Sequence, residues 1–116
     1  MLRHRGSVIA VCLFFLAAGS HLLLAQSDAE LGGTVRDASG AVIPGVSVTV
    51  TKVDTRAART IMTNEVGFFV VPLLPPGAYH VRLSKEGFKP VTQTGITLQV
   101  NQQARMDFTL ELGAVV

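Results

Sequence analysis

The stretch Gly33-Thr-Val-Arg-Asp-Ala-Ser-Gly-Ala-Val-Ile-Pro-Gly-Val-Ser-Val-Thr-Val50 decides the fold of this chain. It contains a short apolar run, a polar turn with Gly40, the rigid pair Pro44-Gly45, and a segment in which valine alternates with serine or threonine. Alternation with a period of two is typical of a sheet that has one packed face and one solvated face. The stretch therefore predicts the first part of a small antiparallel β-sandwich.

The same alternation returns three times further along the chain, and no stretch beyond residue 26 repeats apolar residues at helical spacing over two turns. We expect an all-β domain of about seven strands whose core is built from the apolar members of the four alternating segments. Those members are Val46, Val48, Val50, Tyr79, Val81, Leu83, Ile96, Leu98, Val100, Met106, Phe108, Leu110 and Leu112.

Turn signals separate the strands at short intervals. Asp37 to Gly40 predicts a turn closed by the aspartate side chain, with Gly40 at positive φ, and Pro44-Gly45 suits the centre of a type II turn. Proline cannot donate to a β-ladder, so the run from Pro72 to Gly77 predicts an edge or a crossover between sheets. Further turns are expected at Asn64 to Gly67, Glu86-Gly87 and Asn101-Gln102.

The N-terminus has the pattern of an export signal. Arg3, His4 and Arg5 precede an apolar stretch, and Ala25 offers a small residue for cleavage. Cleavage after Gly19 or Ser20 and an uncleaved anchor are the alternatives. We expect a signal peptide at 1–25, a linker at 26–30, the sandwich at 31–112 and a tail at 113–116. Such a chain is exported to the periplasm, the outer membrane or the cell exterior.

Charge and cysteine content narrow the range of functions. The chain has ten basic and eight acidic residues, and removal of Arg3 and Arg5 with the signal peptide leaves eight of each. A nucleic-acid partner would require a basic surface, which a neutral chain does not indicate. Cys12 lies inside the apolar export segment, where it reads as an apolar filler and not as a lipid-attachment site. The fold is therefore expected to hold without disulfides.

Four ordered motifs resemble the carboxypeptidase regulatory-like domain. They are the opening stretch with Gly33, Asp37, Gly40, Pro44 and Gly45, then Thr63-Asn64-Glu-x-Gly67-Phe-Phe, then Leu74-Pro75-Pro76-Gly77-x-Tyr79, and Lys85-Glu-Gly87-Phe88-Lys. The resemblance implies a transthyretin-like sandwich that serves as a non-catalytic accessory. The segments Gln99 to Gln102 and Phe108 to Gly113 look most like the form of the domain found next to the signal peptide of TonB-dependent receptor-like outer-membrane proteins.

No arrangement of residues predicts catalysis, a metal site or a cofactor. His80 is the one histidine beyond residue 26, and we expect it to face solvent from a strand. Asp37 with Ser39 supplies too few oxygen ligands for calcium, so we interpret the pair as part of the turn. Tyr79 is expected to pack inward with its hydroxyl on a loop backbone group, and Phe88 to fold back under the sheet.

Two classes of function remain open. The first is an interaction module that contacts a protein partner or adjoining receptor domains, for example by strand addition at a sheet edge. The second is carbohydrate binding, which needs an exposed aromatic ring. In a regular strand one of Phe68 and Phe69 faces outward, so this pair holds the candidate ring. The membrane is expected to be a partner only through an uncleaved signal segment.

Overall fold

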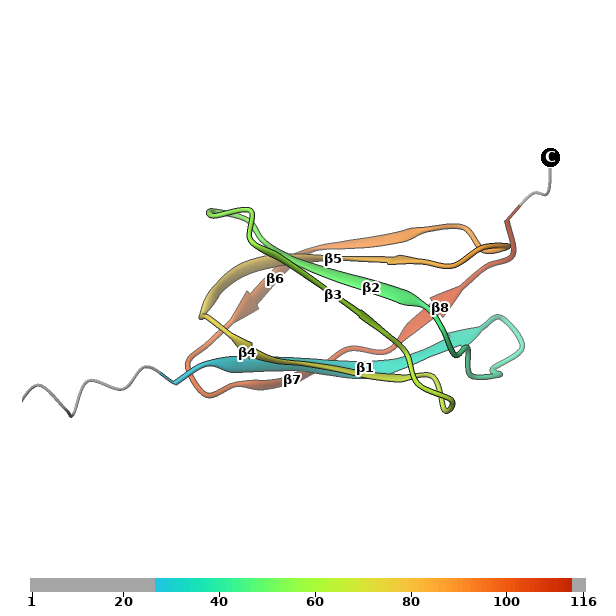
Figure 1. Ribbon diagram of the computed structural model, residues 1–116, viewed down its shortest axis with the longest axis horizontal. Coiled ribbons are helices and arrows are strands. Elements are labelled where there is room, and N and C mark those ends of the chain that lie inside the picture. The colour runs from blue at the N-terminus through green and yellow to red at the C-terminus, as the bar shows by residue number, and fades with distance from the viewer. Residues whose placement is uncertain (1–26, 114–116) are drawn as a thin grey trace, which may run out of the picture.

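The computed structural model describes residues 27–113 and shows a two-layer β-sandwich (Figure 1). The predicted export signal, including Cys12 and the cleavage sites, lies outside the described residues, as do positions 114–116. Within residues 27–113 no helix is long and apolar enough to cross a membrane. The all-β prediction is confirmed for the described part of the chain.

Eight strands make up two sheets. The strands are β1 (Ala29–Asp37), β2 (Ser47–Lys52), β3 (Ala58–Met62), β4 (Phe68–Leu74), β5 (Gly77–Ser84), β6 (Val91–Leu98), β7 (Gln103–Arg105) and β8 (Phe108–Leu110). One sheet has the order β3-β2-β5-β6, and all its pairs are antiparallel. In the other sheet β1 lies between β4 on one side and β7 and β8 on the other.

The sheet built on β1 departs from the antiparallel prediction. β1 pairs with β4 in antiparallel fashion, but with β7 and β8 in parallel, through pairs such as Leu31 with Ala104 and Val35 with Phe108. The expected continuous last strand is divided at Met106 and Asp107 into two strands of three residues, which accounts for the eighth strand. β1 also starts at Ala29, inside the segment expected to be a linker.

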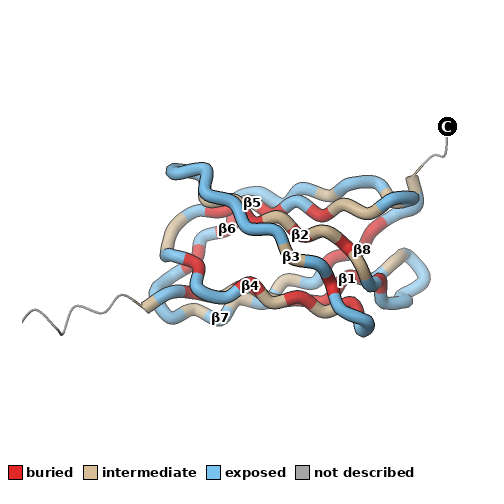
Figure 2. Tube along the Cα trace, in the orientation of Figure 1, coloured by how far each residue is buried: buried red, intermediate tan, exposed pale blue. Residues whose placement is uncertain are grey.

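The core lies between the two sheets (Figure 2). Eleven of the alternating positions behave as predicted: ten are buried, and Met106 is partly buried against the core. Val100 and Leu112 were predicted to be buried, and both predictions are wrong, because the two side chains are 61% and 75% exposed. Each lies beyond the end of its strand, where the alternation of a sheet no longer sets the direction of a side chain.

The turns lie where the sequence places them. The Asp37 carboxylate accepts hydrogen bonds from the Ser39 and Ala41 amides at 2.9 and 3.1 Å, and Gly40 has a φ of 89°. The Asn64 side chain accepts from the Val66 and Phe68 amides at 3.1 and 3.0 Å. Positive φ angles occur at Gly45, Gly67, Gly77, Gly87 and Asn101. The run Pro75-Pro76 carries the chain from β4 in one sheet to β5 in the other.

Candidate functional site

The four free edges of the sandwich differ in how well they are protected against strand addition. β4 contains Pro72, which has no N–H, and has a left-handed residue at Leu73 with a φ of 56°. β6 carries a bulge, because Thr94 and Gly95 lie opposite the single residue His80. The edge formed by β7 and β8 is broken between Arg105 and Phe108. Such devices prevent pairing with other chains.

β3 has none of these devices. Its five residues pair with β2 in an unbroken register from Ala58 with Thr51 to Met62 with Ser47, and the sheet order places β3 at the end of its sheet. The Ala57 carbonyl accepts from the Lys52 amide at 2.9 Å, and the Thr63 amide donates to the Val46 carbonyl at 3.0 Å. These two bonds fix the alternation of the ladder, so the backbone N–H and C=O groups of Ala58, Thr60 and Met62 point to the free edge.

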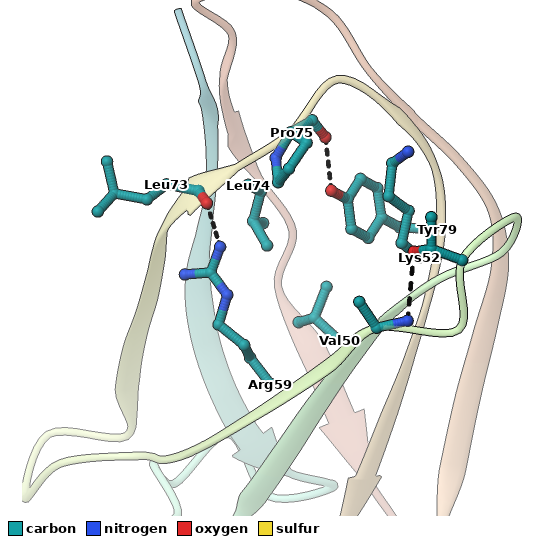
Figure 3. Close-up of a pocket in the computed structure, with 9 residues that line it drawn as sticks. Val50, Lys52, Arg59, Leu73, Leu74, Pro75 and Tyr79 are labelled. Atoms are coloured by element: carbon teal, nitrogen blue, oxygen red, sulfur yellow. Dashed lines mark hydrogen bonds between the residues drawn. The ribbon is translucent and has the colours of Figure 1, made fainter.

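A cavity of about 310 Å³ lies beside β3, between the two sheets (Figure 3). We call it the seam cavity. Its lining includes the apolar side chains of Val50, Leu74 and Tyr79 together with Lys52, Ala57 and Arg59. The Tyr79 hydroxyl donates a hydrogen bond to the Pro75 carbonyl at 2.5 Å, which is the kind of loop contact expected from the sequence. Burial raises the pKa of the Tyr79 hydroxyl above its ordinary value.

Arg59 spans the seam between the sheets. It lies on β3, and its guanidinium donates hydrogen bonds to the carbonyl oxygens of Pro72 and Leu73 on β4. Sequence reasoning missed this residue, because an arginine in an exposed strand carries no signal of a partner in another sheet. The Lys52 ammonium lies 3.0 Å from the Asp54 carboxylate, and the pKa of Asp54 is lowered, chiefly by that hydrogen bond.

The two phenylalanines proposed as a ligand platform lie on opposite faces of β4. Phe69 is buried in the core, where its ring centroid is 6.3 Å from that of Phe108, so Phe68 is the outward member of the pair. Phe68 is half-buried and lines a hollow of about 240 Å³ together with Glu30, Gly32, Gln103 and Arg105. The Arg105 guanidinium carbon lies 5.8 Å from the Phe68 ring centroid, over a face that a sugar would use.

Other residues singled out from the sequence contribute to backbone packing, the core, strand pairing or turns. Gly33 has the Met106 carbonyl oxygen where a side chain would begin, and Phe88 is half-buried against the core. His80 is half-buried and lies opposite Thr51 on β2. The Ser39 hydroxyl donates to the Asp37 carboxylate at 2.5 Å, and this bond is the main cause that lowers the pKa of Asp37. Among residues 27–113 no three His, Cys, Asp or Glu side chains cluster as metal ligands would.

Known proteins resemble this chain in sequence or in fold. The TonB-dependent transporter Oar of Myxococcus xanthus is 34% identical over 119 residues, an alignment that covers all of this chain and 11% of the transporter. The chain therefore spans about a tenth of the length of that relative.

Solved structures share the fold at low sequence identity. The TIE protein of Bacillus anthracis superposes with a TM-score of 0.63 at 18% identity, over 74% of this chain and 17% of that one. A 3-chlorocatechol 1,2-dioxygenase from Rhodococcus opacus superposes with a TM-score of 0.61 at 14% identity, over 77% of this chain and 61% of the enzyme. At these identities the likeness shows the sandwich fold alone.

The sequence model of the carboxypeptidase regulatory-like domain matches residues 30–111, nearly all of the described sandwich. That match spans the four motifs from Gly33 to Phe88 and every strand from β2 to β8. The chain belongs to the carboxypeptidase regulatory-like domain family.

Proposed function

We propose that residues 29–112 form a non-catalytic accessory domain of a TonB-dependent receptor-like protein of the cell envelope, and that the domain works by binding protein. The proposal includes an export signal at 1–25 and a tail at 113–116, and it shortens the linker so that the sandwich begins with β1 at Ala29. The observation that carries it is the regular edge of β3, where the backbone groups of three residues point outward. The other three edges are interrupted by a proline, a bulge or a break. Similarity to the Myxococcus xanthus transporter along the whole chain supports the envelope setting.

The β3 edge can be tested with a photoreactive crosslinker. We would place p-benzoylphenylalanine at Met62, which is 58% exposed on β3, and at Val100, which is 61% exposed beyond the end of β6. In cells that export the full chain, irradiation is expected to give a discrete protein adduct from the first position only. Equal labelling from both positions, or no adduct from either, would refute binding at this edge.

A pair of substitutions at Thr60 separates edge pairing from side-chain effects. Thr60→Pro removes an N–H that points away from β2, whereas Thr60→Val keeps it. Both lose the hydroxyl contact with Thr49, which measures 2.9 Å. We expect the adduct at Met62 to disappear with proline and to persist with valine. Persistence with proline would show that the partner contacts side chains and does not extend the sheet.

Carbohydrate binding is the second candidate, and the hollow beside Phe68 favours it. An aromatic ring flanked by Glu30, Gln103 and Arg105 combines a stacking surface with hydrogen-bonding groups. It ranks lower because the Arg105 guanidinium lies over the ring. Glycan-array binding that is lost with Phe68→Ala and kept with Val66→Ala, at an exposed residue that does not line the hollow, would make this the principal function. No binding across the array would remove it.

A further inference from the structure

The seam cavity lies where the edges of the two sheets diverge. β3 and β4 are joined by the turn at residues 63–67 and separate as they leave it (Figure 1). The cavity opens at the wide end of this wedge, beside Ala57 and Arg59 on one side and Leu74 and Pro75 on the other (Figure 3). Its inner wall includes the buried residues Val50, Leu74 and Tyr79. The wedge is therefore an apolar space next to the unprotected edge.

The lining of the cavity carries positive charge. Lys52 and Arg59 line it, and none of its lining residues is acidic. Lys52 is held by Asp54, but the lysine side chain is 16% exposed while the aspartate is 70% exposed, so the negative partner lies on the solvent side. Arg59 has five N–H donors, and its two bonds to β4 carbonyls leave others for a carboxylate.

The geometry of β3 places the seam cavity where alternate side chains of an added strand would lie. Ala57 and Arg59 are two residues apart and both line the cavity; the Ala57 carbonyl accepts from the Lys52 amide, and Arg59 pairs with Val50 on β2. A strand that pairs with the outward groups of Ala58 and Thr60 has alternate residues on the cavity side of the sheet. Two of its side chains, spaced two residues apart, would then face the wedge together.

We propose that the seam cavity receives an extended peptide segment of a partner protein, which adds to β3 and presents an apolar and an acidic side chain at positions i and i+2. The apolar side chain occupies the space beside Val50, Leu74 and Tyr79. The carboxylate lies between Lys52 and Arg59. This inference rests on the proposed function and specifies the chemistry of the partner at the β3 edge.

The test uses a defined probe and fluorescence anisotropy. The probe is a fluorescein-labelled peptide of sequence TETLTVT, in which Glu and Leu share a face. The control peptide TELTTVT has the same composition but places Glu and Leu on opposite faces. We expect the full chain to bind the first peptide at least about tenfold more tightly than the second, because a carboxylate bonded to two cations is worth more than 1.4 kcal/mol. Equal affinity for both peptides would overturn the proposal.

Adjacent alanines give a matched pair of blocking variants. Ala57 lines the cavity and Ala58 does not, and both are exposed. Ala57→Phe is expected to weaken binding of the first peptide by about tenfold or more, whereas Ala58→Phe leaves it within about twofold. Equal effects would place the peptide elsewhere.

Two charge variants act in opposite directions. Lys52→Gln removes a cation and is expected to weaken binding by several-fold. Asp54→Asn releases Lys52 from its ion pair and is expected to strengthen binding, a gain that loss of folding cannot produce. Failure of Asp54→Asn to strengthen binding, or weaker binding by both variants, would refute the carboxylate position.

Two outcomes would identify another occupant, and either of them overturns the proposal. Octanoate that competes at the affinity of the peptide would show a site for small apolar carboxylates. Concentration-dependent dimers that Ala57→Phe abolishes would show a second copy of the chain. An adduct at Met62 without peptide binding would refute the peptide chemistry and leave the proposed function intact. Peptide binding without an adduct would refute the proposed function and leave the peptide chemistry intact.

Discussion

Arg59 on β3 donates a hydrogen bond across the seam to the carbonyl oxygen of Leu73 on β4, the residue at which the β4 backbone becomes left-handed. A second bond from the same guanidinium goes to the Pro72 carbonyl. One side chain from one sheet thus satisfies two carbonyl groups at the end of an edge strand of the other. This contact protects the β4 edge and leaves the β3 edge free.

Arg59→Ala should lower the free energy of unfolding by about 1 kcal/mol, since two charge-assisted hydrogen bonds are lost at an exposed site. Urea denaturation measures the change. Arg82→Ala is the control, because Arg82 is exposed on the other face of the same sheet, and it should change stability by less than about 0.5 kcal/mol. Equal effects of the two variants would mean that the seam contact adds no stability.

Thr63→Val should lower the free energy of unfolding by about 2–3 kcal/mol, because it leaves two buried backbone groups without hydrogen-bond partners. The Thr63 hydroxyl accepts from the Val46 amide at 2.9 Å and donates to the Ile43 carbonyl at 2.8 Å. Thr60→Val loses only an exposed contact between two hydroxyl groups, and it should change the free energy of unfolding by less than about 0.5 kcal/mol. Thermal unfolding followed by circular dichroism compares the two, and similar melting temperatures would contradict the assignment.

Gly33→Ala should prevent folding or lower the free energy of unfolding by more than about 4 kcal/mol. A Cβ atom at this position would lie 1.7 Å from the Met106 carbonyl oxygen, so β1 and the link between β7 and β8 would have to separate. At Gly40 an added Cβ atom has no neighbour within 4 Å, so only the backbone φ of 89° opposes Gly40→Ala. This variant should lower the free energy of unfolding by about 1 kcal/mol. The yield of folded protein and the urea midpoint distinguish them; a well-folded Gly33→Ala variant would contradict the close approach.

Stability should fall at high pH through Tyr79. Burial raises the pKa of its hydroxyl in the folded protein above the value of 10.0 that it has when exposed. The folded state therefore holds this proton more tightly, and the resulting stability is complete below pH 10 and is lost as the pH rises through the folded pKa. Urea midpoints between pH 8 and pH 11 test this. Tyr79→Phe should lack the part of the decline that is due to this group, and an unchanged profile would exclude Tyr79 as its source.

The sequence predicted what depends on local pattern. Alternation placed Val48, Val81 and Phe108 in the core, and turn chemistry placed the loops at Asp37 and Asn64. These features follow from the preferences of a few neighbouring residues. The same pattern failed at Val100 and Leu112, because a strand's end depends on where its hydrogen-bonding partner ends, which local sequence does not record.

The features of the candidate site depend on distant parts of the chain. The parallel pairing of β1 with β7 and β8 joins residues from opposite ends of the domain, and nothing in the alternation distinguishes parallel from antiparallel partners. Arg59 reads as an exposed strand residue until β4 is placed beside it. For the pair Phe68-Phe69 the sequence indicated that one ring faces outward, and only the packing of Phe69 against Phe108 shows which one.

The position of β1 between β4 and the last two strands governs when the domain can fold. The Thr34 amide bonds to a carboxylate that lies 73 residues later in the sequence, and β8 supplies the final neighbour of β1. Contacts of such long range slow folding to milliseconds or seconds in small β-proteins. A chain that emerges N-terminus first cannot complete this sheet until Leu110 has appeared, so the domain can acquire its native structure only when its synthesis is almost finished.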